Sequence, residues 1–246
     1  MATKNDSKER KAKIAQMQRE AKAAERRRTL TVVAAVATVV VLMAGAVTYA
    51  IVTDKNRVPG GALTSLGVSP AAAACDPVTT DAPNGSGEHV GPGTSKPNET
   101  RVKYTTVPPS SGPHYVSPEY PNREFYTVAD RPRIETLVHN LEHGYTLLWY
   151  DSTTTAQQLA TLKAITAKAN ATTAARNKFI VSAWDNSYGS FPAGKHFALS
   201  HWSGEPGAAA TKQAGHRQLC ANVSGAVVNS FITAYPLTSA PEAGAQ

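Results

Sequence analysis

Several features that would assign a function directly are missing from this chain of 246 residues. It has only two cysteines and no Cys-x-x-Cys pair, which argues against a thioredoxin-type catalyst and against a small scaffold held by many disulfides. It has no Gly-x-Ser-x-Gly sequence, and no glycine-rich loop joins a predicted strand to a helix, so neither a serine hydrolase of that type nor a phosphate-binding loop is expected. The composition also excludes collagen and a membrane protein with many spans.

The chain has almost no net charge outside its first 28 residues. Residues 1–28 carry ten Lys or Arg side chains and four acidic ones, whereas the rest of the chain carries fifteen and fourteen. The formal net charge of +7 therefore comes almost entirely from one end. A nearly neutral remainder argues against a nucleic-acid partner.

One long apolar run follows the basic residues. Residues 29–52 contain no charged side chain and are long enough to cross a hydrocarbon core of roughly 30 Å as a helix. The basic excess before this run predicts that residues 1–28 are a cytoplasmic helix or tail and that the remaining chain lies outside the cell membrane. A cleaved signal peptide is the alternative, since Ala44-Gly45-Ala46 resembles a cleavage site, but the long charged segment before the run favours a retained anchor.

Residues 53–100 are rich in Pro, Gly, Ser, Thr and Ala and show no sustained periodicity, which predicts a flexible linker. Cys75 lies in this segment, and Cys220 is the only other cysteine. In an oxidising compartment two cysteines are most simply joined as one disulfide, which would attach the linker to the C-terminal part of the folded domain. We expect no role for His89, which also lies in the linker.

An α+β domain with a small mixed sheet is predicted over residues 101–238, followed by a disordered tail at 239–246. Each of the three tryptophans falls in or at the end of a predicted strand, so we interpret them as core residues. The order of the predicted strands and helices, β-α-β-β-α, indicates helices packed on a sheet. The expected elements are a strand at 145–150, a helix from about 154 to 170 with a Thr154–Gln157 capping box, strands at 179–184 and 196–202, and a helix from about 224 to 235.

Histidine and glutamate form the one compact group of chemically capable residues. His139, Glu142 and His143 make the pattern His-x-x-Glu-His, the inverted form of a zinc-protease motif in which two His bind the metal and the Glu is the general base. On a helix, residues four apart project from one face, so both imidazoles can reach one ion. Gly144 and the strand that begins at Tyr145 leave room for only a short helix, which argues against a protease.

A further histidine, His114, lies in a stiff loop at 107–115 that contains two consecutive prolines and a Ser-Ser-Gly-Pro turn. A site made of His114, His139 and His143, with Glu142 as a ligand or just behind one, would suit zinc or copper. The alternative is that these imidazoles are buried structural groups that hydrogen-bond backbone carbonyls or Glu142. Three isolated histidines are interpreted as structural or exposed: His196, His201 and His216.

These segments resemble a known family. PPSSGPHY at 108–115, LVHNLEHGYTLLWY at 137–150 and a Ser-Ala-Trp sequence at 182–184 resemble the DUF3105 family over roughly residues 100–243. The resemblance implies a bacterial, largely actinobacterial, protein with one N-terminal membrane helix or a lipid anchor and an extracytoplasmic domain. It implies no reaction, and it implies that the family's motif positions are occupied here by His114, His139, Glu142 and His143.

The sequence therefore predicts a non-enzymatic domain, held at the cell membrane by residues 29–52, that binds a metal ion (zinc or copper) or a partner protein. The binding surface is expected around His114, His139 and His143. One anchor and one small outer domain suit an accessory subunit of a membrane complex in the cell envelope. The alternative function is a zinc-dependent hydrolase in which His139 and His143 hold the metal and Glu142 is the general base.

Overall fold

The computed structural model describes residues 61–85, 87–120 and 123–245, together with a few single positions between 17 and 38. The chain divides into two compact units, Met1–Arg57 and Val58–Gln246. The predicted membrane helix at 29–52 lies outside the described residues, apart from two single positions. Within the part of the chain that is described, no helix has the length and apolar character needed to cross a membrane.

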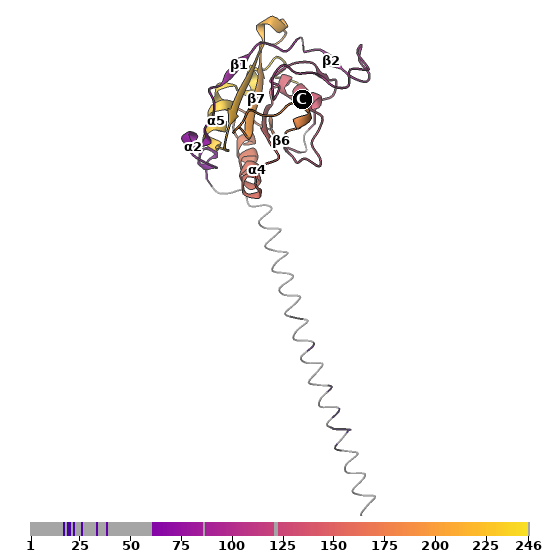
Figure 1. The fold of residues 1–246 in the computed structure, drawn as a ribbon, viewed down its shortest axis with the longest axis vertical. Coiled ribbons are helices and arrows are strands. Elements are labelled where there is room, and N and C mark those ends of the chain that lie inside the picture. The colour runs from indigo at the N-terminus through magenta and orange to yellow at the C-terminus, as the bar shows by residue number, and fades with distance from the viewer. Residues whose placement is uncertain are drawn as a thin grey trace, which may run out of the picture. The chain divides into compact units, whose positions relative to one another are not determined.

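A six-stranded mixed sheet runs through the second unit in the order β1-β8-β7-β5-β6-β4 (Figure 1). β4, β6 and β5 pair in parallel, whereas β5, β7, β8 and β1 pair antiparallel. The predicted α+β class is therefore confirmed. The strands are β1 (Thr79–Asp81), β4 (Phe125–Tyr126), β5 (Thr146–Tyr150), β6 (Phe179–Ala183), β7 (Phe197–Ser203) and β8 (Ala214–Cys220).

The central strands of this sheet are covered on both faces. β5 and β6 are buried along their whole length, as expected for apolar runs in the middle of a sheet. Because side chains alternate along a strand, Leu148 and Tyr150 enter one apolar core, and Leu147 and Trp149 enter the other. The sheet therefore separates two cores.

The first core is closed by helices α4 (Ala156–Asn170) and α5 (Gly225–Ala234), close to the predicted ranges. The capping box of α4 is formed by Thr155 and Gln158, one residue later than predicted. Ser224 caps α5 by accepting a hydrogen bond from the backbone N–H of Val227. Both helices thus begin at side chains that satisfy their first backbone donors.

The second core is closed by helix α3 (Ile134–Glu142). Its residues Ile134, Leu137, Val138 and Leu141 recur at the spacing of one helical face and are all buried. The same core contains Trp149, Trp184 and Trp202, which confirms the interpretation of the three tryptophans as core residues. α3 therefore lies on the sheet face opposite to α4 and α5.

Residues 61–100 belong to the folded domain, which corrects the predicted linker. β1 joins the large sheet beside β8, and residues 66 and 68 exchange backbone hydrogen bonds with residues 223 and 225 next to α5. Partners far along the chain, rather than local periodicity, determine these short elements, so a window of sequence could not reveal them. The further elements are η1 (Leu63–Ser65), α2 (Pro70–Ala73), β2 (His89–Val90) and β3 (His114–Tyr115).

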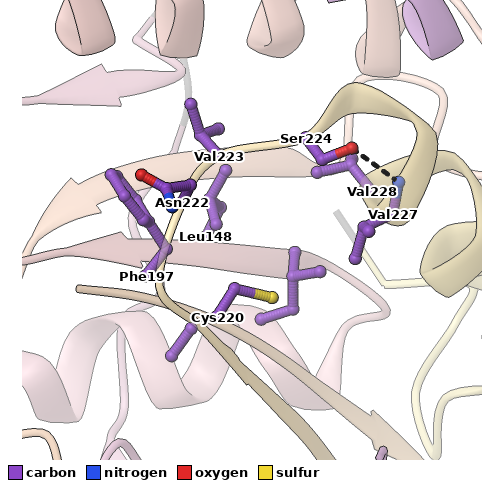
Figure 2. A pocket seen from close by; sticks show the side chains of 10 residues that line it. Leu148, Phe197, Cys220, Asn222, Val223, Ser224, Val227 and Val228 are labelled. Carbon is purple, nitrogen blue, oxygen red and sulfur yellow. Dashed lines mark hydrogen bonds between the residues drawn. The ribbon is translucent and has the colours of Figure 1, made fainter. Parts of the chain in front are cut away.

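The predicted disulfide between Cys75 and Cys220 is present. It joins the chain after α2 to the end of β8, where a small apolar pocket lies between the sheet and α5 (Figure 2). Leu148, Phe197 and Val227 line this pocket with Cys220. Since the pocket has room for no more than about one water molecule, we interpret it as a packing gap rather than a binding site.

Residues 239–245 are also part of the fold, which corrects the predicted disordered tail. The backbone N–H of Gly204 donates to the carbonyl of Ser239 at 2.8 Å, and Ala240 is fully buried. The N–H of Glu242 donates to the carbonyl of Glu142 at 3.0 Å, at the end of α3. The small residues of this segment let the backbone lie close to its neighbours, which composition alone does not indicate.

We expect the Cys75–Cys220 disulfide to contribute strongly to stability. It closes a separation of 145 residues, for which the chain-entropy model gives up to about 5 kcal/mol. A Cys75→Ser/Cys220→Ser variant should lose about 2–5 kcal/mol of unfolding free energy in denaturant titrations. A loss below about 0.5 kcal/mol would show that packing alone holds residues 61–81 on the sheet.

His201 should make stability depend on pH. It lies in β7 between the hydroxyls of Thr146 and Ser239, at 3.2 and 3.0 Å, and burial, followed by the charge of His216, lowers its pKa to about 3. The stability that the neutral His201 contributes is fully present above pH 6.5, the ordinary pKa of histidine. It is lost as the pH falls towards 3, because only the unfolded chain readily binds the proton.

The loss approaches about 1.4 kcal/mol per pH unit, or about 3 kcal/mol at pH 4.5. A His201→Gln variant lacks the titrating group, so its unfolding free energy should fall less between pH 7 and pH 4.5 than that of the unaltered chain. Parallel pH curves for the two proteins would contradict this assignment.

Candidate metal centre

Helix α3 presents the His-x-x-Glu-His pattern at its C-terminal end. His139 and Glu142 lie in its last turn, and His143 is the residue that caps it. Gly144 follows with a φ of +89°, and a Cβ at this position would lie 2.3 Å from the carbonyl oxygen of Leu237. A glycine is therefore required where the chain turns sharply from α3 into β5.

His114 approaches Glu142 from β3. Its Nδ1 lies 2.8 Å from the carbonyl oxygen of Gly112, so this nitrogen carries the hydrogen and donates it. The other nitrogen, Nε2, lies 3.0 Å from Oε2 of Glu142. The His114 side chain is completely buried, which places this nitrogen beside a carboxylate inside the protein.

His89 reaches the same place through the second, two-stranded sheet. β2 and β3 run parallel in a register that pairs His89 with His114. The ring centre of His89 lies 5.0 Å from that of His114 and 5.0 Å from that of His139. This exposed histidine has a place in the site that its sequence does not predict, because no local pattern marks it and the pairing with β3 alone brings it there.

Four of these residues form a cluster that could hold a metal ion. His89, His114, His139 and Glu142 each offer one ligand atom, and the four atoms all lie within 4.8 Å of one another. Nε2 of His114 has no hydrogen-bond partner among the described residues, because its contact with Glu142 lacks hydrogen-bond geometry. A buried imidazole nitrogen without such a partner is unusual and points to a group outside the described residues.

His143 lies beside this cluster rather than in it. The Nδ1 of His139 donates to the carbonyl oxygen of Tyr115 at 2.6 Å, which leaves the lone pair of its Nε2 available. Nε2 of His143 lies 3.0 Å from this Nε2 and 3.4 Å from Oε2 of Glu242. Three of the four predicted ligands therefore meet in the cluster, and the fourth contacts one of them.

The surroundings favour the neutral form of two of the imidazoles, His139 and His89. Burial, and then the charge that His114 would carry, lowers the pKa of His139 to about 4. Burial and His114 likewise lower the pKa of His89. A neutral imidazole retains the lone pair that binds a metal ion, so the lowered pKa values of His139 and His89 favour ligation by these two residues.

Neighbouring residues hold the ligands in place. A Cβ at Gly87 would lie 2.4 Å from Oε1 of Glu142 and 3.1 Å from the Trp202 ring, so only glycine lets the backbone approach the carboxylate. The side chain of Asn140 both donates to and accepts from the backbone of Glu119, which ties the loop after β3 to α3. The outer contacts that orient candidate ligands directly are the Nδ1 hydrogen bonds of His114 and His139 to backbone carbonyls.

The remaining histidines lie elsewhere. His201 is hydrogen-bonded in the core, as described above. His216 contacts the hydroxyls of Thr80 and Ser203, and His196 contacts Asp151. They are not among the residues that could share an ion in the described part of the chain.

The fold and this cluster define a small α+β domain with a histidine-rich candidate metal centre. The family model for proteins of unknown function named DUF3105 matches residues 95–246, and the chain belongs to that family. Searches of curated proteins and of solved structures found no match to it. His89 and Cys75 precede the matched residues, so the family match covers His114, His139, Glu142 and His143 but not the whole cluster.

We predict that His89 contributes to metal affinity although it is exposed. A His89→Ala variant removes one of four donors and should weaken the binding of Zn²⁺ about 10- to 100-fold in a competition titration. Its unfolding free energy without metal should stay within about 0.5 kcal/mol of the unaltered value, because an exposed side chain is removed. Equal affinities would show that the three buried donors suffice.

Proposed function

We propose that this protein is a membrane-anchored, extracytoplasmic domain that binds a divalent metal ion, zinc or copper, through His89, His114, His139 and Glu142. The observation that carries the proposal is Nε2 of His114, which is buried, lacks a hydrogen-bond partner among the described residues and lies in a cluster of donors. An ion at the centre of the cluster would supply the missing partner.

Donor spacing and donor type support this function. Two ligands that each lie about 2.0–2.1 Å from one zinc ion are roughly 3 Å apart. This matches the 3.0 Å between Nε2 of His114 and Oε2 of Glu142. Imidazole and carboxylate donors without sulfur suit Zn²⁺ or Cu²⁺ better than Cu⁺, which prefers thiolate and thioether ligands.

The Cys75–Cys220 disulfide supports the proposed location outside the cytoplasm, since such bonds persist in oxidising compartments. In this proposal residues 29–52 are the membrane anchor and residues 1–28 remain in the cytoplasm. One anchor with one folded domain suits an accessory subunit of a cell-envelope membrane complex.

The position of Glu142 favours binding over hydrolysis. A hydrolase with His139 and His143 as ligands would keep Glu142 free to act as the general base. Here an oxygen of Glu142 lies among the donor atoms, and His143 lies outside the group of four. This arrangement supports a site that retains its ion.

The proposal predicts one ion per chain. Full-length protein in mild detergent, stripped with a chelator and titrated separately with Zn²⁺ and Cu²⁺, should bind one equivalent of at least one of them. A His114→Ala variant should bind that ion more than about 100-fold more weakly, because it loses the most buried of the proposed metal ligands.

His196→Ala is the matched control for this titration, because His196 lies outside the cluster and contacts Asp151 and Thr153. It should bind the ion with unchanged affinity. Absence of zinc or copper binding by the unaltered chain, or equal losses in the two variants, would overturn the proposed function.

A further inference from the structure

The last described residues lie directly against the candidate metal centre. We call residues 239–245 the closing segment. Besides the hydrogen bonds already described for Ser239 and Glu242, Nζ of Lys178 donates to the carbonyls of Ala243 and Ala245 at 3.0 and 2.8 Å. The same ammonium donates to the carbonyl of His143 at 2.6 Å, so one lysine joins the closing segment to the end of α3.

Two acceptors compete for one hydrogen beside this lysine. Nε2 of His143 lies near the lone pair of His139 Nε2, at 3.0 Å, and near the carboxylate of Glu242, at 3.4 Å. Both neighbours accept hydrogen bonds, so Nε2 of His143 is the donor. The shorter distance indicates that His139 receives this hydrogen when no ion is bound.

A metal ion and this hydrogen cannot both occupy the lone pair of His139. The opposite nitrogen of His139 is already donating to the carbonyl of Tyr115, so His139 has no second lone pair to offer. An ion bound at His139 therefore displaces the His143 hydrogen. Among the described residues, Glu242 is an acceptor close enough to take it, and its side chain is half exposed and able to adjust.

We propose that metal binding stabilises the closing segment: when an ion occupies the lone pair of His139, the Nε2–H of His143 donates to the carboxylate of Glu242 instead. The inference rests on the proposed metal-binding function and adds its regulation. Because coupling between two binding events is reciprocal, Glu242 must strengthen metal binding by the same factor by which the ion stabilises the closing segment. Residues outside the ligand set thereby sense whether the centre is loaded.

Hydrogen exchange of the full-length protein in mild detergent, with and without Zn²⁺, tests the proposal. Zinc should slow exchange of the amides at 239–245 about 10-fold, the effect typical of losing or gaining one outer contact of a metal ligand. Glu242→Ala should abolish this slowing and weaken zinc binding by a similar factor. Glu242→Gln, which keeps an acceptor oxygen, should retain most of both effects.

Glu205→Ala is the matched control, since Glu205 is an exposed glutamate in the loop after β7. It should leave both the exchange and the affinity unchanged. If zinc binds at one ion per chain but leaves exchange at 239–245 unaltered, the coupling is overturned and the metal site stands. Equal losses in Glu242→Ala and Glu242→Gln would attribute the effect to charge and also overturn it, whereas no zinc binding at all overturns both proposals.

Discussion

The constraint on which the candidate site depends is the buried Nε2 of His114, which lies beside Glu142 and has no hydrogen-bond partner among the described residues. Leaving a buried polar group without a partner costs about 1–3 kcal/mol, which is a large part of the stability of an ordinary domain. The hydrogen bond from Nδ1 to Gly112 holds the ring so that this nitrogen faces Glu142 and the other imidazoles. Such a cost within a cluster of possible metal ligands supports the proposed metal site, because functional sites often break the local rules that stabilise the rest of a fold.

The two-faced sheet explains how this constraint is met. α3 binds one face through four apolar side chains, so its orientation is set by packing and its last turn can carry His139 and Glu142. Gly144 then returns the chain into the sheet at once. The donors on α3 are therefore as rigid as the core below them, whereas His89 lies on a two-residue strand at the surface.

Much of this architecture could be predicted from the sequence, and the reason for each failure is physical. The apolar runs of β5 and β6 and the helical stripe of α4 are local patterns, and they predict the ends of these elements to within a residue or two. β1 and β2 have no such pattern, because pairing with distant strands creates them. His89 was missed for the same reason, and Glu242 was missed because a segment rich in small residues resembles a disordered tail.

The site also joins three parts of the chain that local folding does not bring together. His89 comes from β2, His114 from β3 and the remaining donors from α3, and the closing segment adds Glu242 beside them. An ion that binds only when all these parts are in place stabilises the folded state by mass action, and this stabilisation grows with the logarithm of the ratio of the ion's concentration to Kd. Since β2 has only two residues of pairing, its position is the one most open to this influence. Under the proposed function, metal occupancy would therefore act first on the least secured parts of the domain, β2 and the closing segment, which local sequence patterns leave unmarked.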